Sequence, residues 1–132
     1  MRKVLAIASI FAITICSAQN VFENKKVEKF YYAIDDAYWD YDFDFILKNE
    51  DKALEFFESV KDTTASNVFS AIAEAYYEYA EFEPSVQYYE KSLSILREVG
   101  EDALAKDIVA SLANVKSEMG QLQGAEDLYL EV

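Results

Sequence analysis

Apolar side chains recur at helical spacing along most of the chain. Over residues 27–39 they fall three and four positions apart, which is the pattern of an amphipathic helix. The same spacing predicts five further helices, over residues 49–60, 65–80, 84–99, 102–119 and 124–132. Residues 40–48 break the pattern because aromatic side chains there alternate with aspartates, and we interpret them as an irregular or extended acidic link.

Residues that start and end helices stand between the predicted segments. Asp62 and the two threonines after it are good N-caps, and Pro84 is well tolerated in the first turn of a helix. Gly100 and Gly120 stand where the next two helices are expected to end, since glycine readily adopts the left-handed conformation found there. Helices of this length joined by short links pack as antiparallel neighbours, so the sequence predicts an all-α fold.

A self-similar pattern relates two parts of the chain at a constant offset, which is the interval from Phe69 to Val109. The first unit comprises Phe69, Ile72, Ala73, Tyr76, Ser85 and Tyr89, and the second comprises Val109, Leu112, Ala113, Lys116, Ala125 and Tyr129. The stretch Ala80-Glu81-Phe82 likewise matches Gly120-Gln121-Leu122. A weaker third unit lies upstream, where Ala53-x-x-x-Phe57 precedes Ser85-x-x-x-Tyr89 by a shorter interval.

These spacings resemble the tetratricopeptide pattern, which has a large residue, Leu-Gly and Tyr on one helix and Ala-x-x-x-Phe on its partner. The resemblance covers residues 50–132 and implies antiparallel helix pairs stacked as a short right-handed α-solenoid. The period is longer than the usual one of about 34 residues and is similar to that of kinesin-light-chain-type arrays. The residues implied to pack between helices are Ile72, Ala73, Tyr76, Ser85, Tyr89, Leu112, Ala113, Ala125 and Tyr129.

In tetratricopeptide arrays the exposed face of each first helix lines an inner groove. Carried over by matching position, this face comprises Asn67, Ser70, Glu74, Tyr77, Glu78, Asp107, Ala110, Asn114, Ser117 and Glu118. Family members that bind a terminal carboxylate use Lys and Arg there, and this face has neither. The resemblance therefore implies an acidic groove that binds a protein or peptide of basic or mixed charge.

Residues 1–18 have the three parts of a secretory signal peptide. Two basic residues precede a largely apolar run from Val4 to Ile15, and small residues follow up to Ala18, so cleavage is expected before Gln19. The run is shorter than the roughly 20 residues that a membrane-spanning helix needs, so export without a membrane span is expected. Lipid anchoring at Cys16 is not expected, because the bulky Ile15 stands where a small residue is required.

The composition restricts the available chemistry. The chain has no His, and its single Cys lies at position 16 within the leader. The remaining chain therefore lacks the usual zinc ligands, disulfides, and the side chains most often used as nucleophile or general base. A net charge of -13 repels nucleic acid and anionic lipid. We expect no enzymatic activity, no cofactor and no nucleic-acid partner.

Four aspartates in and just after the acidic link have part of the spacing of an EF-hand calcium loop. They are Asp40, Asp42, Asp44 and Asp51. Phe45 occupies the position where such a loop needs glycine, and Asp51 replaces the usual glutamate. No metal site is expected, and a small calcium-binding helical protein stays a minor alternative.

The favoured function is a non-catalytic protein–protein interaction module of an exported protein. Residues 1–18 form the signal peptide, 19–48 an N-terminal helix and the acidic link, and 49–132 the repeat domain. The main alternative is the N-terminal sensory part of a longer signalling or proteolytic protein. The last predicted helix ends on apolar residues, and no polar helix follows to cover them. We therefore expect an incomplete array or self-association through this helix.

Overall fold

The computed structural model describes residues 24–120 and 122–131, except for the side chains at positions 122, 123, 125 and 129. The described residues form helices, turns and short links without a strand, which confirms the predicted all-helical class. The predicted signal peptide over residues 1–18 lies outside the described residues. The chain divides into two compact units, Met1–Tyr32 and Ala33–Val132.

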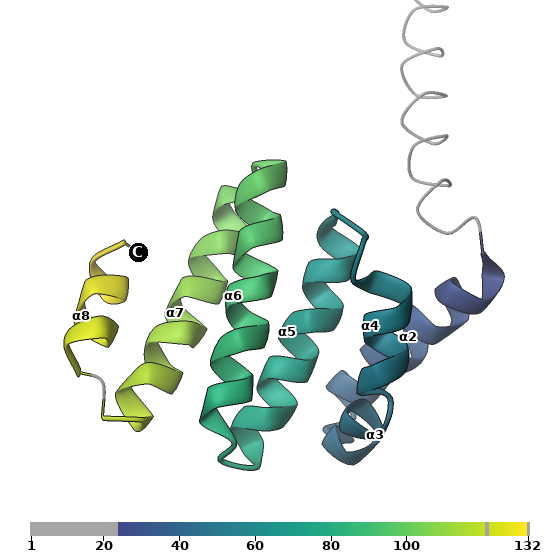
Figure 1. The fold of residues 1–132 in the computed structure, drawn as a ribbon, viewed down its shortest axis with the longest axis horizontal. Coiled ribbons are helices and arrows are strands. Elements are labelled where there is room, and N and C mark those ends of the chain that lie inside the picture. Colours follow the sequence, from purple (N-terminus) through teal and green to yellow (C-terminus); the bar gives the residue numbers. More distant parts are fainter. Residues whose placement is uncertain (1–23, 121, 132) are drawn as a thin grey trace, which may run out of the picture. The chain divides into compact units, whose positions relative to one another are not determined.

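The described residues contain seven helices, labelled in Figure 1. They are α2 (Lys25–Trp39), α3 (Phe43–Lys48), α4 (Glu50–Phe57), α5 (Thr63–Glu78), α6 (Phe82–Val99), α7 (Asp102–Glu118) and α8 (Leu122–Glu131). All six helices expected from the apolar spacing are present, with ends close to the predicted ones. The helix α3 was not predicted.

The short helix α3 replaces the irregular or extended link expected over residues 40–48. Asp42 caps it, because its side chain accepts a hydrogen bond from the amide of Phe45 at 3.1 Å. Only Ile46 of this helix is fully buried, whereas Phe45 stays partly exposed. The alternation of aromatic and acidic residues was therefore misleading, since it does not separate a buried face from a solvent face.

Four helices end at a residue in the left-handed conformation. These residues are Tyr41 (φ 57°), Ala80 (φ 57°), Gly100 (φ 80°) and Gly120 (φ 76°). At three of the four ends the next amide donates to the carbonyl five residues earlier, at 2.8 to 2.9 Å: Asp42 to Ala37, Glu81 to Tyr76, and Glu101 to Leu96. This is the Schellman arrangement that satisfies carbonyls at a helix C-terminus.

Three of these left-handed residues repeat along the chain. Tyr41, Ala80 and Gly120 each end the helix before a turn, and they stand at nearly equal intervals in the sequence. The interval agrees with the offset between the self-similar units. A residue with a Cβ atom in this conformation costs about 1 to 2 kcal/mol relative to glycine, so Tyr41 and Ala80 are both unfavourable residues at these turns.

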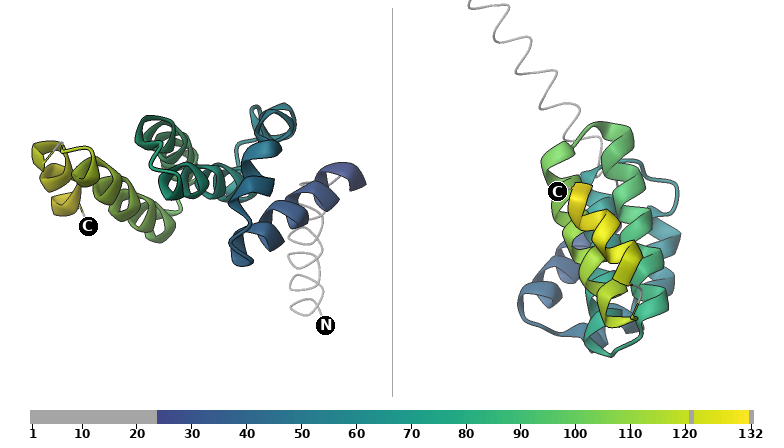
Figure 2. Two further views of the ribbon diagram at one scale, coloured as in Figure 1. Left: turned by 90° about the horizontal axis from the view of Figure 1, so that it is seen from below. Right: turned by 90° about the vertical axis from the view of Figure 1, so that its left-hand side faces the viewer.

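Successive helices of the second unit pack against each other. α5 packs on α6, α6 on α7, and α7 on α8, while α3 and α4 also contact α5. Figures 1 and 2 show α7 between α6 and α8, with consecutive helices running in opposite directions. The helix pair α5–α6 comes close at three buried serines, where Ser85 Oγ donates to the carbonyl of Ala73 at 2.8 Å and Ser66 Oγ lies 2.7 Å from Ser92 Oγ.

The residues implied to pack between helices differ in their burial. Ile72, Ala73, Ser85, Tyr89, Leu112 and Ala113 are buried. Tyr76 is only half-buried, and its hydroxyl donates to Glu50. The side chains of Ala125 and Tyr129 lie outside the described residues. Between residues 24 and 131, leaving out position 121, no helix has the length and apolar character needed to cross a membrane.

Candidate functional site

A small cavity lies where α5, α6 and α7 meet. Its volume is about 150 Å³, and we call it the Glu74 cavity. It is lined by Glu74 and Tyr77 of α5, Tyr89 of α6, and Ser111, Asn114 and Val115 of α7. Three of these six residues, Glu74, Tyr77 and Asn114, belong to the groove implied by the sequence resemblance. Residues of α5 and α7 that were predicted to line the groove therefore lie around one shared cavity.

The carboxylate of Glu74 is fixed by a tyrosine from the neighbouring helix. The hydroxyl of Tyr89 donates a hydrogen bond to Glu74 Oε2. Burial of Tyr89, followed by the hydrogen bond and the charge of Glu74, raises the pKa of this hydroxyl well above its ordinary value. Tyr89 therefore stays protonated near neutral pH and serves as a permanent hydrogen-bond donor to the carboxylate.

The negative charge of Glu74 also affects a tyrosine of α2. Burial raises the pKa of Tyr38, and the negative charge of Glu74 acts in the same direction. Tyr38 belongs to the same compact unit as α5. Glu74 therefore acts on tyrosines of both α2 and α6.

The other predicted groove residues do not line this cavity. Asn67, Glu78, Asp107, Ser117 and Glu118 are exposed, while Ser70 is half-buried and donates to the carbonyl of Asn67 at 3.0 Å. Ala110 is half-buried. In the sequence of α5 and of α7, these residues come before and after the residues that line the Glu74 cavity.

Sequence reasoning missed three of the lining residues. Tyr89 was assigned to packing alone, although it both packs between helices and lines the cavity. Ser111 and Val115 stand one position after Ala110 and Asn114 of the predicted face. Their inclusion shows that the side of α7 lining the cavity is turned toward α6, and only the helix packing reveals this rotation.

The region around the cavity is strongly acidic. Residues 62–90 contain six carboxylates and no Lys or Arg. The six are Asp62, Glu74, Glu78, Glu81, Glu83 and Glu90. Because α5 itself carries no basic side chain, Glu74 has no cation on its own helix to neutralise it.

Two of the four aspartates that resemble part of a calcium loop have other partners. Asp42 caps α3, and Asp44 accepts a hydrogen bond from the hydroxyl of Tyr79. In the described part of the chain, no group of three or more His, Cys, Asp or Glu side chains is placed to hold a metal ion.

Comparison with known proteins adds no relative. No protein-family model matches the chain, and neither the curated proteins nor the solved structures include a match.

Proposed function

We propose that this chain is a non-catalytic interaction module that binds a basic segment of another protein through the Glu74 cavity and the acidic faces of α5 and α7. The observation that carries the proposal is a half-buried carboxylate at a small hollow lined by two tyrosines, in a stretch without a basic side chain. The leader-like residues 1–18 further support a role outside the cytoplasm.

A tetratricopeptide-like stack is the arrangement that we propose for the repeat domain. Two observations support it: left-handed helix ends recur at nearly equal intervals, and the small residues Ala73 and Ser85 meet where α5 and α6 pack. In such a stack α5 and α7 are the first helices of successive pairs. Their exposed faces would then line one continuous groove.

The chemistry of the Glu74 cavity favours the end of a Lys or Arg side chain. Its volume of about 150 Å³ is suited to one side-chain head rather than to a larger ligand. An ammonium or guanidinium group there would donate to Glu74, and charge-assisted bonds of this kind are about twice as strong as neutral ones. Tyr77 and Tyr89 also line the cavity, and aromatic rings attract cations.

The absence of an enzymatic role is part of the same proposal. It rests on the sequence after residue 18, which has neither His nor Cys. The carboxylate and tyrosines of the cavity form a binding surface, and a protonated Tyr89 that is held by Glu74 is a poor general base.

A binding assay with a matched pair of variants tests the proposal. The probe is a fluorescent alanine peptide with two arginines, and the control peptide has glutamines in their place. We expect Glu74→Gln to weaken binding of the arginine peptide by about tenfold, roughly 1.4 kcal/mol. Glu83→Gln removes the same charge from an exposed position of α6 outside the cavity and should change the affinity by less than about twofold.

Two results would contradict the proposed function. One is equal weakening by the two substitutions, which would mean that only the net charge attracts the peptide. The other is equal affinity for the arginine and glutamine peptides, since a cation-binding cavity must distinguish them.

A further inference from the structure

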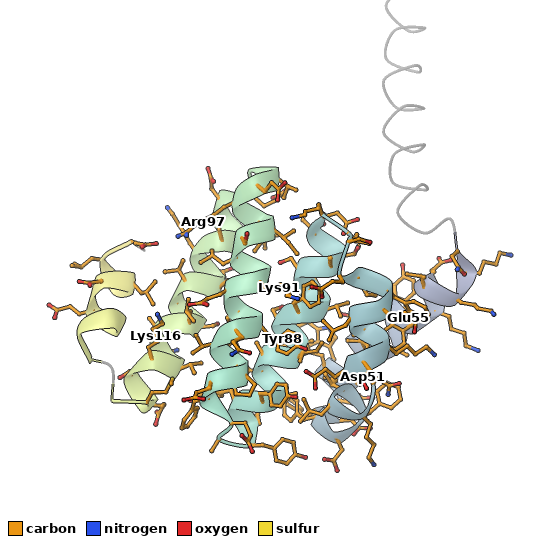
Figure 3. All side chains as sticks on the ribbon, viewed as in Figure 1. Asp51, Glu55, Tyr88, Lys91, Arg97 and Lys116 are labelled. Atoms are coloured by element: carbon orange, nitrogen blue, oxygen red, sulfur yellow. The ribbon has the colours of Figure 1, made fainter. Side chains whose placement is uncertain are left out.

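A second and larger cleft lies between α4, α5 and α6. Its volume is about 550 Å³, and we call it the Glu50 cleft. Its lining includes Glu50, Leu54 and Glu58 of α4, Tyr76 of α5, and Tyr88 and Lys91 of α6. Figure 3 shows Tyr88 and Lys91 on the side of α6 that faces α4. The size lies within the range of about 300 to 1,000 Å³ that is common for small-molecule sites.

The carboxylate of Glu50 is held in place by two tyrosines. The hydroxyl of Tyr88 donates to Glu50 Oε1 at 2.5 Å, and the hydroxyl of Tyr76 donates to Glu50 Oε2. The two rings are stacked, with centroids 6.0 Å apart and an interplanar angle of 14°. Each carboxylate oxygen accepts one of these bonds and keeps a second lone pair for another donor.

The only basic residue that lines the cleft is already paired. Lys91 Nζ lies 2.7 and 2.8 Å from the two carboxylate oxygens of Glu58, and it also lies 5.0 Å from the centroid of the Phe69 ring. None of the ion pairs between described residues involves Glu50. Because the charges of Glu58 and Lys91 cancel, the charged side chains of the lining carry one net negative charge, which is that of Glu50.

Nearby carboxylates reinforce this negative potential. Burial, the hydrogen bond to Glu50, and the charges of Glu50, Glu81 and Asp51 together raise the pKa of Tyr76 to about 12. Burial and Glu50 likewise raise the pKa of Tyr88. Both hydroxyls therefore remain protonated donors, and the cleft offers a site for positive charge rather than for an anion.

We propose that the Glu50 cleft binds an organic cation, an ammonium or guanidinium group, which pairs with the oriented carboxylate of Glu50 beside the Tyr76 and Tyr88 rings. A carboxylate positioned by two donors needs no rearrangement to receive the cation, and aromatic faces attract cations further. The group can belong to a small molecule or to a Lys or Arg side chain of a protein.

This site is separate from the Glu74 cavity. Tyr88 and Tyr89 are adjacent on α6, and each lines only one of the two hollows. Neighbouring positions of a helix point about 100° apart, which explains how consecutive tyrosines serve different sites. The proposal for the Glu50 cleft therefore does not depend on the proposed function.

NMR titration of the protein with butylguanidinium tests the proposal, with butylurea as the neutral probe of the same shape. We expect chemical-shift changes around Glu50, Tyr76 and Tyr88 with the cation and none with butylurea. A parallel titration with N-acetylarginine methylamide, in which the guanidinium stands on a peptide-like unit, distinguishes the two sources of the group. Tighter binding of this second probe would indicate a protein side chain as the natural occupant.

Two substitutions on α4 form the matched pair. Glu50→Gln keeps an oxygen that can accept from a tyrosine and should lower the affinity for butylguanidinium at least tenfold, with the helical circular dichroism unchanged. Glu55→Gln removes an exposed carboxylate from the same helix, labelled in Figure 3, and should change the affinity less than twofold. Equal affinity of the Glu50→Gln variant and the unchanged protein, or no response to either cation, would overturn the proposal.

Discussion

Two adjacent tyrosines of α6 each donate a hydroxyl hydrogen bond to a glutamate of another helix. Tyr88 donates to Glu50 of α4, and Tyr89 donates to Glu74 of α5. Both bonds join positions that lie far apart in the sequence. No local spacing reveals such pairs, so the sequence predicted that Tyr89 would be buried but not that it would orient a carboxylate.

The hydroxyl of Tyr89 should contribute to stability. Tyr89→Phe leaves the half-buried carboxylate of Glu74 without this donor, and we expect a loss of about 1 to 2 kcal/mol in the free energy of unfolding. Tyr79→Phe is the control, because the hydroxyl of Tyr79 bonds to Asp44 on the exposed surface. Urea denaturation should show a lower midpoint for the first variant and an almost unchanged one for the second. Equal midpoints for the two variants would disprove the role of Tyr89.

The same hydroxyls predict how stability depends on pH. In the unfolded chain a tyrosine loses its proton near pH 10, whereas Tyr76 has a raised pKa of about 12 in the folded protein. Above pH 10 the unfolded state therefore binds fewer protons than the folded state, and stability falls as pH rises from about 10 toward 12. Below pH 10 the stabilisation that follows from the raised pKa of Tyr76 is fully present.

Thermal melts between about pH 8 and pH 11 measure this effect. The melting temperature of the unchanged protein should fall across the upper part of this range, and it should fall less for Tyr88→Phe, which has one fewer tyrosine with a raised pKa. Identical slopes would contradict a raised pKa of Tyr88 in the folded state.

At the scale of helices, the turn after α5 offers a direct test of strain. Ala80 has φ 57° and Gly100 has φ 80°, so both adopt a conformation that suits glycine. Ala80→Gly should stabilise the protein by about 1 kcal/mol, because relief of the strain exceeds the added chain entropy. Gly100→Ala should destabilise it by a similar amount, although no atom lies within 4 Å of the added methyl group. Chemical denaturation measures both, and a destabilising Ala80→Gly would contradict the left-handed turn.

The contact between α5 and α6 gives a second test at this scale. Ala73 is fully buried where Ser85 approaches its carbonyl. Ala73→Leu should overpack this contact and cost about 1 to 3 kcal/mol. Ala103→Leu makes the same change at an exposed position of α7 and should be nearly neutral. Similar urea midpoints for the two variants would argue against a close helix contact at Ala73.

Helix positions could be predicted from the sequence because each long helix has a buried apolar stripe and clear end signals. Asp62 caps α5 through the amide of Ala65, and Gly100 ends α6 in the left-handed conformation. The helix α3 could not be predicted, because it is short and only Ile46 among its residues is buried. Three residues of the Glu74 cavity were predicted through the tetratricopeptide resemblance, while Ser111 and Val115 depend on how α7 is rotated against α6.

At the scale of the whole molecule, charge separates along the sequence. The stretch 62–90 carries six acids and no base, whereas Lys91 and Arg97 lie in the rest of α6. Lys91 pairs with Glu58, and Arg97 pairs with Glu131 of α8 at 2.7 Å. The basic residues of α6 are therefore paired within the chain, whereas none of the ion pairs between described residues involves Glu74.

The most direct test of the central claim is to map where the arginine-containing peptide binds. In an NMR titration of the uniformly labelled protein, we predict the largest amide shifts at Glu74, Tyr77, Ser111 and Asn114, decreasing as salt is added because ion pairing is screened. Residues outside the cavity, such as Glu83, should shift little. Binding of the peptide with the largest shifts away from α5 and α7 would contradict the account.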